Sequence, residues 1–339
     1  MKISSSSETP EHQLVQRIKS WTGSRYIGDD CAVLPSGLLV STDTLVEGTH
    51  FRLATTSLAD LGWKAIAVNL SDIAAMGGRP RHLLVSVGFP ATMSEREMES
   101  LYGGFVDCAN RYRTRIVGGD LVKARDLTIS VTVMGETHEH GVFTRSGAEV
   151  GDVVIVTGDF GASAAGFYLL EHGETETLSA AEQAGVWRAN RSGGTCVTRH
   201  RRPLPRLCES WALNRAALGA GALMDASDGL ADALVQIARS SNVALRVDLK
   251  NVPVHDETLE TAQKAGRDPL DWVLYGGEDY ELVACISEQS WQRLQGFEHN
   301  PFKAIGIVED GDGVSLTLGG KCGPDLDLEK CFQHTSAPN

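Results

Sequence analysis

The side chains best suited to chemistry in this sequence are aspartates that stand where an apolar segment meets a turn of glycine or small residues. Two of them are adjacent, Asp29 and Asp30 in the segment GDDCAVL. Gly-Asp-Asp is also ordinary turn chemistry, so a plain turn before a strand is the alternative there. On a strand, only one of the two side chains could face a given site. The other such acids are Asp43 in STDTL, Asp72 in NLSDIAAMGG, Asp120 in VGGD, and Asp225 with Asp228 in MDASDG.

Asp72 lies in a segment that is predicted to form a helix, from about residue 58 to residue 76. The residues one and two turns before it on the same side, such as Ala65 and Val68, are mostly apolar, so we expect Asp72 to be partly buried. An isolated buried carboxylate is unfavourable and needs a partner. Lys64 or a helix end would be a structural partner, whereas a bound cation would serve several converging aspartates at once.

The sequence lacks the patterns of several other kinds of site. It contains no HExxH, no GxSxG nucleophile elbow, no GxxxxGK[ST] phosphate loop and no GxGxxG. DGDG at residues 310–313 is too short for an EF-hand loop, and we interpret it as a hairpin turn. What remains is a site where carboxylates hold magnesium and glycine turns let phosphates approach the backbone. That combination points to phosphoryl transfer.

The composition limits the classes of partner. The chain has 339 residues, a formal net charge of -13 and no evident basic patch, so no nucleic-acid partner is expected. Its seven cysteines are odd in number and show no CxxC spacing, which fits reduced thiols. The N-terminal segment has no apolar signal core, and no apolar run approaches the length of a membrane span. We therefore expect a soluble, cytoplasmic protein with no membrane partner.

Strand and helix patterns alternate through the whole chain, and its length suits two domains. Ser57 and Ser94 are the expected N-caps of two helices. The polar, glycine-containing segment at residues 137–152 is typical of a boundary. We predict an N-terminal domain at residues 1–140 and a C-terminal domain at residues 141–339, each with strands and helices.

Seven segments occur in a fixed order over nearly the whole chain: GDDCAVL, STDTLVEGTHF, KAIAVNLSDIAAMGGRP, VGGD, TRSGA, DASDGL and GGEDYEL. Together they closely resemble the thiamine-monophosphate kinase family, a branch of the aminoimidazole-ribonucleotide-synthetase superfamily. No single segment decides this, but NLSDIAAMGG with GGEDYEL is more typical of this kinase than of its relatives.

The resemblance implies a fold and a reaction. The fold is α/β (of the α+β type), with two domains, and the N-terminal sheet pairs with its twin in a homodimer close to the nucleotide. ATP gives its terminal phosphoryl group directly to thiamine monophosphate, yielding thiamine diphosphate and ADP, with magnesium ions as cofactors. No general base is assigned, because the attacking phosphate oxygen is already ionised at neutral pH.

The resemblance also implies site residues. The magnesium-binding positions are Asp30, Ser41, Thr42, Asp43, Asp72, Asp120, Asp225 and Asp228. The ATP-binding positions, which include the nucleotide turn, are Tyr102, Gly119, Asp120, Arg145 and Ser227. The positions expected to contact thiamine monophosphate are His50, Glu278 and Phe332, the last as a stacking aromatic. The tail KCFQHT around Phe332 departs from the family's usual Gly-aromatic-x-His-aromatic pattern. Asp29 is expected to point away from the metals or to support them indirectly.

Three alternatives stay open at this stage. Each site residue has a structural explanation of its own, such as a cap, a turn or a surface ion pair. Another ATP-using member of the superfamily, selenophosphate synthetase or aminoimidazole-ribonucleotide synthetase, would have a similar sequence. A maturation or scaffold protein that keeps the fold and only binds nucleotide is the rival from another class, and loss of the metal aspartates would favour it.

Overall fold

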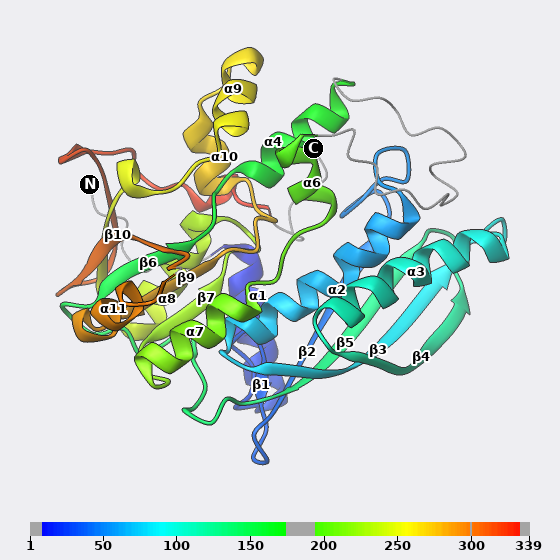
Figure 1. The fold of residues 1–339 in the computed structure, drawn as a ribbon, viewed down its shortest axis with the longest axis horizontal. Helices are drawn as coiled ribbons and strands as arrows, with labels where there is room; N and C mark the ends of the chain where they lie inside the picture. Colours follow the sequence, from blue (N-terminus) through cyan, green and yellow to red (C-terminus); the bar gives the residue numbers. More distant parts are fainter. Residues whose placement is uncertain (1–8, 174–193, 299, 333–339) are drawn as a thin grey trace.

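The computed structural model describes residues 9–173, 194–298 and 300–332. Two β-sheets lie side by side along the long axis of the molecule, one from each half of the chain (Figure 1). The predicted mixed α/β fold with two sheets is therefore confirmed.

The N-terminal sheet has five strands in the order β1-β2-β5-β3-β4, and only β3 and β4 run parallel. Along β5, Ile129, Val131 and Val133 are buried, whereas Ser130 and Thr132 point to the other, more exposed face. The sheet is thus covered on one side. Its strands are β1 (Ala32–Val33), β2 (Leu38–Val46), β3 (Arg79–Phe89), β4 (Arg115–Lys123) and β5 (Thr128–Glu136).

Two long helices, α2 (Leu58–Ala75) and α3 (Glu95–Arg111), cover the buried face of this sheet (Figure 1). Both begin at the predicted N-caps, Ser57 and Ser94, whose side chains accept hydrogen bonds from the first turn. α2 is buried on almost every side, which explains its apolar sequence. The two helices pack closely, since a Cβ at Gly104 would lie 2.0 Å from a carbonyl oxygen of α2.

The C-terminal sheet has seven strands in the order β12-β11-β8-β10-β6-β9-β7. Its strands are β6 (Val153–Thr157), β7 (Ala222–Asp225), β8 (Ala244–Asp248), β9 (Leu282–Ile286), β10 (Phe302–Glu309), β11 (Gly313–Leu318) and β12 (Lys321–Cys322). The other helices are α1 (Pro10–Thr22), α4 (Ala162–Glu171), α6 (Thr195–Arg201), α7 (Leu207–Ala217), α8 (Leu230–Ser241), α9 (Asp256–Ala265), α10 (Pro269–Tyr275) and α11 (Glu288–Gln295), with 3-10 turns at Leu249–Asn251 and Leu328–Lys330.

The prediction of a hairpin turn at residues 310–313 is wrong. This segment joins β10 to β11, but both strands pair with β8, which lies between them. Composition indicates that the chain turns at this point, but the next neighbour in the sheet depends on contacts with a strand that lies far away in the sequence.

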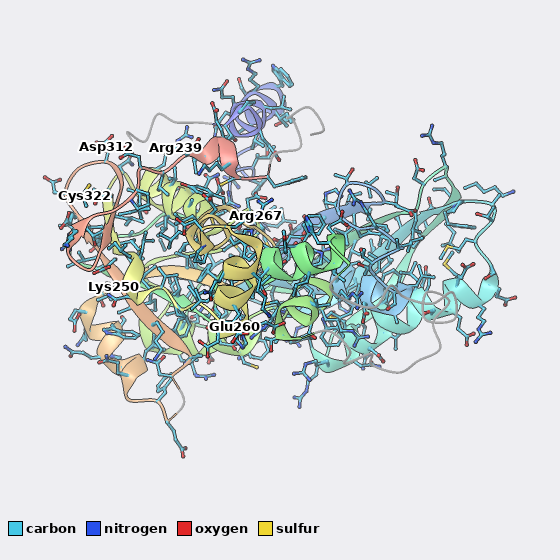
Figure 2. The ribbon with its side chains drawn as sticks, turned by 90° about the horizontal axis from the view of Figure 1, so that it is seen from above. Arg239, Lys250, Glu260, Arg267, Asp312 and Cys322 are labelled. Carbon is cyan, nitrogen blue, oxygen red and sulfur yellow. The ribbon has the colours of Figure 1, made fainter. Side chains whose placement is uncertain are left out.

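One apolar core joins the two sheets. It contains Val131 of β5 and Ile66 of α2 together with Ile155 of β6, Leu213 of α7 and Leu282 of β9. Because the core crosses the predicted boundary near residue 140, two independent domains remain a prediction. Figure 2 shows the molecule from above, with α1 at its edge, and labels side chains of the C-terminal half: Arg239, Lys250, Glu260, Arg267, Asp312 and Cys322.

In the part of the chain that the structure describes, we find no helix with both the length and the apolar character needed to cross a membrane.

Candidate active site

The face of β2 that is turned toward α2 carries two of the predicted magnesium ligands, Ser41 and Asp43. The Ser41 hydroxyl donates a hydrogen bond of 2.6 Å to Asp72 Oδ2, in the last turn of α2. The N–H of Asp43 donates to Asn69 Oδ1, almost one turn earlier, at 3.1 Å. Residues 41 and 43 share a face because side chains alternate along a strand. β2 and α2 thereby bring Asp43 and Asp72 together.

Thr42, between these two residues, points to the opposite face of the sheet. Its hydroxyl donates to the carbonyl oxygen of Val131 at 2.9 Å. The structure therefore does not bring this hydroxyl to the other ligands, and a metal contact at Thr42 stays a prediction.

Two further aspartates approach from the C-terminal half and from the bend before β1. Asp225 ends β7 and accepts a short hydrogen bond from the hydroxyl of Ser71 on α2. Asp30 Oδ1 accepts a hydrogen bond of 2.6 Å from the guanidinium of Arg145. We name these four acids the acid cluster: Asp30, Asp43, Asp72 and Asp225.

Burial and mutual repulsion raise the pKa values of two acids of the cluster, Asp72 and Asp225. The pKa of Asp225 rises to about 8, because of burial first and then the charge of Asp30. The pKa of Asp72 rises well above its ordinary value, because of burial and then the charges of Asp43 and Asp225. Asp72 also lies near the C-terminus of α2, where the helix dipole disfavours an anion. Ionisation of the cluster therefore requires positive charge.

The donor set of the cluster fits magnesium. Asp30 Oδ2 is buried without a hydrogen-bond partner, although Oδ1 is paired with Arg145. Such an orphaned oxygen is rare in proteins and suits a bound cation. Carboxylate and hydroxyl oxygens are the ligands that magnesium prefers. The residues that would hold it are Asp30, Ser41, Asp43, Asp72 and Asp225.

Asp29 and Asp30 both turn toward Arg145. Residues 28–31 form a bend, so the alternation expected of a strand does not apply. Asp29 Oδ1 accepts from the N–H of Arg145 at 3.1 Å, while Asp30 binds its guanidinium. The pKa of Asp29 rises to about 6, because of burial and then the charge of Asp30. Asp29 thus holds the segment that carries the arginine.

A pocket beside this bend gathers four residues of the predicted sites: Arg145, Ser227, Asp228 and Phe332. The buried Nε of Arg145 has no hydrogen-bond partner, so it can donate to an anion such as a phosphate. The pKa of Asp228 rises to about 7, because of burial and then the charge of Asp232. Asp228 lines this pocket just before α8, and a metal contact of its carboxylate stays a prediction.

Asp120 lies apart from the acid cluster within this chain. It stands on β4, the edge strand, and the sheet register places it level with Ser86, Ser130 and Thr44. These residues belong to the more exposed face, opposite to Asp43. The described chain therefore does not bring the whole predicted ligand set together.

Gly119 and Tyr102 have structural explanations here. A Cβ at Gly119 would lie 1.8 Å from the carbonyl oxygen of Val85, so close pairing of β3 and β4 requires glycine. Tyr102 packs edge to face on Phe105 within α3, with ring centroids 5.0 Å apart. Their nucleotide contacts stay predictions.

The three residues predicted to contact the substrate lie close together, although they come from distant parts of the chain. The rings of His50 and Phe332 have centroids 6.2 Å apart. The charge of His50 acts on the carboxylate of Glu278. Residues 333–335 of the unusual tail lie outside the described residues.

Lys64 and His200 belong to this group as well, and sequence reasoning missed their role. Lys64 Nζ lies 2.8 Å from Glu278 Oε1, and His200 Nδ1 lies 3.3 Å from Glu278 Oε2. The suggestion that Lys64 is the partner of Asp72 is therefore wrong, since its ammonium pairs with Glu278. A lysine in an otherwise apolar helix was the available signal, but it did not identify the partner.

Main-chain hydrogen bonds join the substrate residues to the acid cluster. They link the GGEDY loop (residues 276–280) to the DASDG loop (residues 225–229). The N–H groups of Glu278 and Tyr280 donate to carbonyl oxygens of the DASDG loop at 2.6 and 3.2 Å. The pKa of Tyr280 is raised by burial and then by the charges of Glu278 and Asp43, which places this residue beside both groups.

The sequence of this chain matches known families and enzymes over most of its length. The family model described as AIR synthase related protein, N-terminal domain, matches residues 28–137, and its C-terminal counterpart matches residues 149–319. The thiamine-monophosphate kinase of Bacillus subtilis is 37% identical over 297 residues, which cover 84% of this chain and 85% of the relative. The Aquifex aeolicus enzyme of the same name is 34% identical over 315 residues, covering 91% and 94%. This chain belongs to the thiamine-monophosphate kinase family.

Solved structures agree with this family membership. A structure described as AaThiL complexed with AMPPCP and TMP matches with a TM-score of 0.79 and 34% identity, covering 93% of this chain and 95% of that one. The hydrogenase maturation protein HypE of E. coli matches with a TM-score of 0.67 but only 19% identity, covering 93% and 97%, and shows the fold alone.

Proposed function

We propose that this thiamine-monophosphate kinase family member transfers the terminal phosphoryl group of ATP directly to thiamine monophosphate, giving thiamine diphosphate and ADP. The observation that carries the proposal is the joining of two sites by the DASDG and GGEDY loops. One is the acid cluster with Arg145, whose Nε is an unused donor, and the other contains His50, Glu278 and Phe332. The relatives' names and the neighbour described with AMPPCP and TMP support the same reaction.

The acid cluster would hold the magnesium ions, which neutralise the negative charge of the two phosphate-bearing substrates when bound. Ser41 and Ser71 orient the carboxylates of Asp72 and Asp225 by donating to one oxygen of each. The other oxygens then stay available. Arg145, anchored through Asp30, lines the pocket that would hold the nucleotide phosphates, and its buried Nε is an unused hydrogen-bond donor.

A general base is not part of this proposal. The acceptor oxygen belongs to a phosphate whose second pKa is near ~6, so it is already ionised at neutral pH. What the chain must provide is alignment of two anions and compensation of their charge. Glu278 would accept a hydrogen bond from the amino group of the pyrimidine ring, and Phe332 would stack on an aromatic ring of the substrate.

A homodimer is part of the same proposal. Val117, Leu121 and Val122 on the edge strand β4 are 54%, 57% and 51% exposed, which is unusual for apolar residues gathered on one strand. A second copy that covers this strand and the exposed sheet face would bury them. It would also bring Asp120 close to a subunit interface, where this acid would complete a ligand set that one protomer leaves incomplete.

A cytoplasmic location is also proposed rather than observed. All seven cysteines are free thiols, including exposed Cys208 and Cys322, which suits a reducing compartment.

The test is an assay for thiamine diphosphate and ADP with ATP, magnesium and thiamine monophosphate. Control reactions omit the thiamine compound or replace it with free thiamine. We expect thiamine diphosphate only from the monophosphate. Magnesium-dependent ATP binding without this product would contradict the proposed acceptor and favour another superfamily substrate or a nucleotide-binding scaffold.

A further inference from the structure

Lys64 is a charged side chain in an apolar environment. It lies on α2 among buried residues such as Leu61 and Val68, and only 1% of its surface is exposed. A buried ammonium without a partner would destabilise the fold severely. Its nitrogen lies 2.8 Å from Glu278 Oε1, in the C-terminal half of the chain, and this ion pair joins the two halves.

The side chain of Glu278 is partly exposed to solvent, whereas that of Lys64 is buried. The Glu278 side chain is 27% exposed and the Lys64 side chain 2%. The second carboxylate oxygen of Glu278 lies 3.3 Å from His200 Nδ1, which also lies 3.0 Å from the hydroxyl of Ser163. The pKa of His200 falls to about 3, because of burial and then the charge of Lys64, so this imidazole is neutral. Lys64, and not His200, therefore provides the positive charge in direct contact with Glu278.

The backbone of the GGEDY loop adopts a conformation that needs external support. Gly277, Glu278 and Tyr280 have φ angles of 65°, 58° and 51°, in the left-handed region. Two of the three are not glycine, and a bulky residue adopts this region rarely. The loop keeps this shape through its bonds to the DASDG loop and through the Lys64 ion pair.

We propose that Lys64 is a positioning residue for the acceptor substrate: its buried ammonium fixes Glu278 in a strained loop conformation and keeps its carboxylate ionised toward the substrate pocket. The inference rests on the proposed function. Lys64 does not touch the substrate, because it is buried behind Glu278, and it acts through this one carboxylate.

The first experiment uses Lys64→Met, which keeps an unbranched side chain of similar volume and removes its charge. We expect the KM for thiamine monophosphate to rise at least tenfold, while the KM for ATP and kcat change less than threefold. An equal rise in both KM values would overturn the proposal, since it would indicate general damage where the two halves meet.

The pH dependence distinguishes positioning from packing. The charged and titratable groups that face Glu278 are Lys64 from α2, His200 from α6, His50 and Tyr280. Burial raises the pKa of Glu278, but the charge of Lys64 opposes this effect, and the net shift is downward. Without Lys64 the pKa rises, so the ratio of variant to wild-type KM for thiamine monophosphate should increase from pH 8 to pH 6. A ratio independent of pH would contradict the assignment.

A double variant keeps the test decisive if Lys64→Met alone does not fold. Lys64→Met combined with Glu278→Gln leaves no unpaired buried charge, so we expect it to fold. Its KM for thiamine monophosphate should equal that of Glu278→Gln within threefold, because Lys64 acts only through Glu278. In Glu278→Gln alone, the amide oxygen still accepts a hydrogen bond from the Lys64 ammonium. A further tenfold rise would show an independent role and overturn the proposal.

The control is Arg246→Met, which removes an exposed ion pair with Glu309 at 2.6 Å between β8 and β10. It should leave both KM values unchanged. The wild-type enzyme, measured in the same assay, separates the two proposals. If the wild type forms no thiamine diphosphate, the proposed function fails, whereas a wild type that forms it with an unaltered Lys64→Met variant refutes only the role of Lys64.

Discussion

The acid cluster and the Glu278 site are both built from buried carboxylates, yet they satisfy them in opposite ways. In the acid cluster, Asp72 and Asp225 receive hydroxyl hydrogen bonds, and their pKa values rise. At Glu278 a buried lysine supplies the opposite charge, and the pKa of the carboxyl falls. The difference shows that the acid cluster can accept cations from solution, whereas the Glu278 site already contains the positive charge of Lys64.

The largest expected effect comes from breaking the acid cluster. Asp72→Asn should lower turnover about a thousandfold, because a metal contact at a transferring phosphate is worth several kcal/mol. The metal-free protein should stay folded and melt at an equal or higher temperature, since the substitution relieves repulsion. Activity and thermal unfolding measure the two effects.

The matched control for this variant is Asp126→Asn, at an aspartate that is 57% exposed beside Arg125 and away from the cluster. Full activity of Asp72→Asn would refute the metal-site assignment, and so would a large loss of activity in the control.

Substitutions at the Glu278 site should have smaller effects, and these should be confined to the KM for thiamine monophosphate. His50→Ala should raise the KM for thiamine monophosphate about tenfold, the equivalent of ~1.4 kcal/mol, and leave the KM for ATP nearly unchanged. The reason is that His50 lies beside Phe332 and acts on Glu278, the other two residues expected to contact this substrate. Initial rates at varied concentrations of each substrate measure this, and equal effects on both would argue against a substrate role.

Stability in the absence of magnesium should fall as pH rises. The folded pKa values of Asp225, Asp228 and Asp29 are raised to about 8, about 7 and about 6. Between pH ~4, the unfolded value, and pH 8 the folded protein holds more protons than the unfolded chain. The contribution of these protons is fully present below the unfolded pKa and is lost as pH rises through the folded values.

Thermal unfolding across this pH range, with EDTA and then with magnesium, tests the comparison directly. Magnesium binds the ionised cluster, so it should restore the melting temperature at pH 8 by on the order of 5 °C and have little effect near pH 4. A magnesium effect that does not depend on pH would show that the cation binds elsewhere.

The smallest effect is expected at Asp29. Asp29→Asn keeps an oxygen that can accept from the N–H of Arg145 and should lower kcat only about two- to threefold. Asp29→Ala removes this acceptor and should lower kcat more, because the arginine segment loses its anchor. Equal effects of the two substitutions would mean that the charge of Asp29, rather than its hydrogen bond, matters.

The sequence by itself determined the elements and the family. Ser57 and Ser94 marked helix starts because capping depends on residues within one turn. The alternation of buried and less buried residues along β5 likewise follows from the period of two in a strand. The ordered segments identified the kinase family and named the acids of the cluster, since they stand at the ends of regular elements.

Only the tertiary structure decided which of these residues meet. It put Asp43 and Asp72 together, and it left Thr42 on the other face of the sheet and Asp120 on an exposed edge. It also paired the ammonium of Lys64 with the carboxylate of Glu278, a residue more than two hundred positions away. The physical reason is that local patterns fix the direction of a side chain within its own element, whereas its partner depends on how distant elements pack around a shared core.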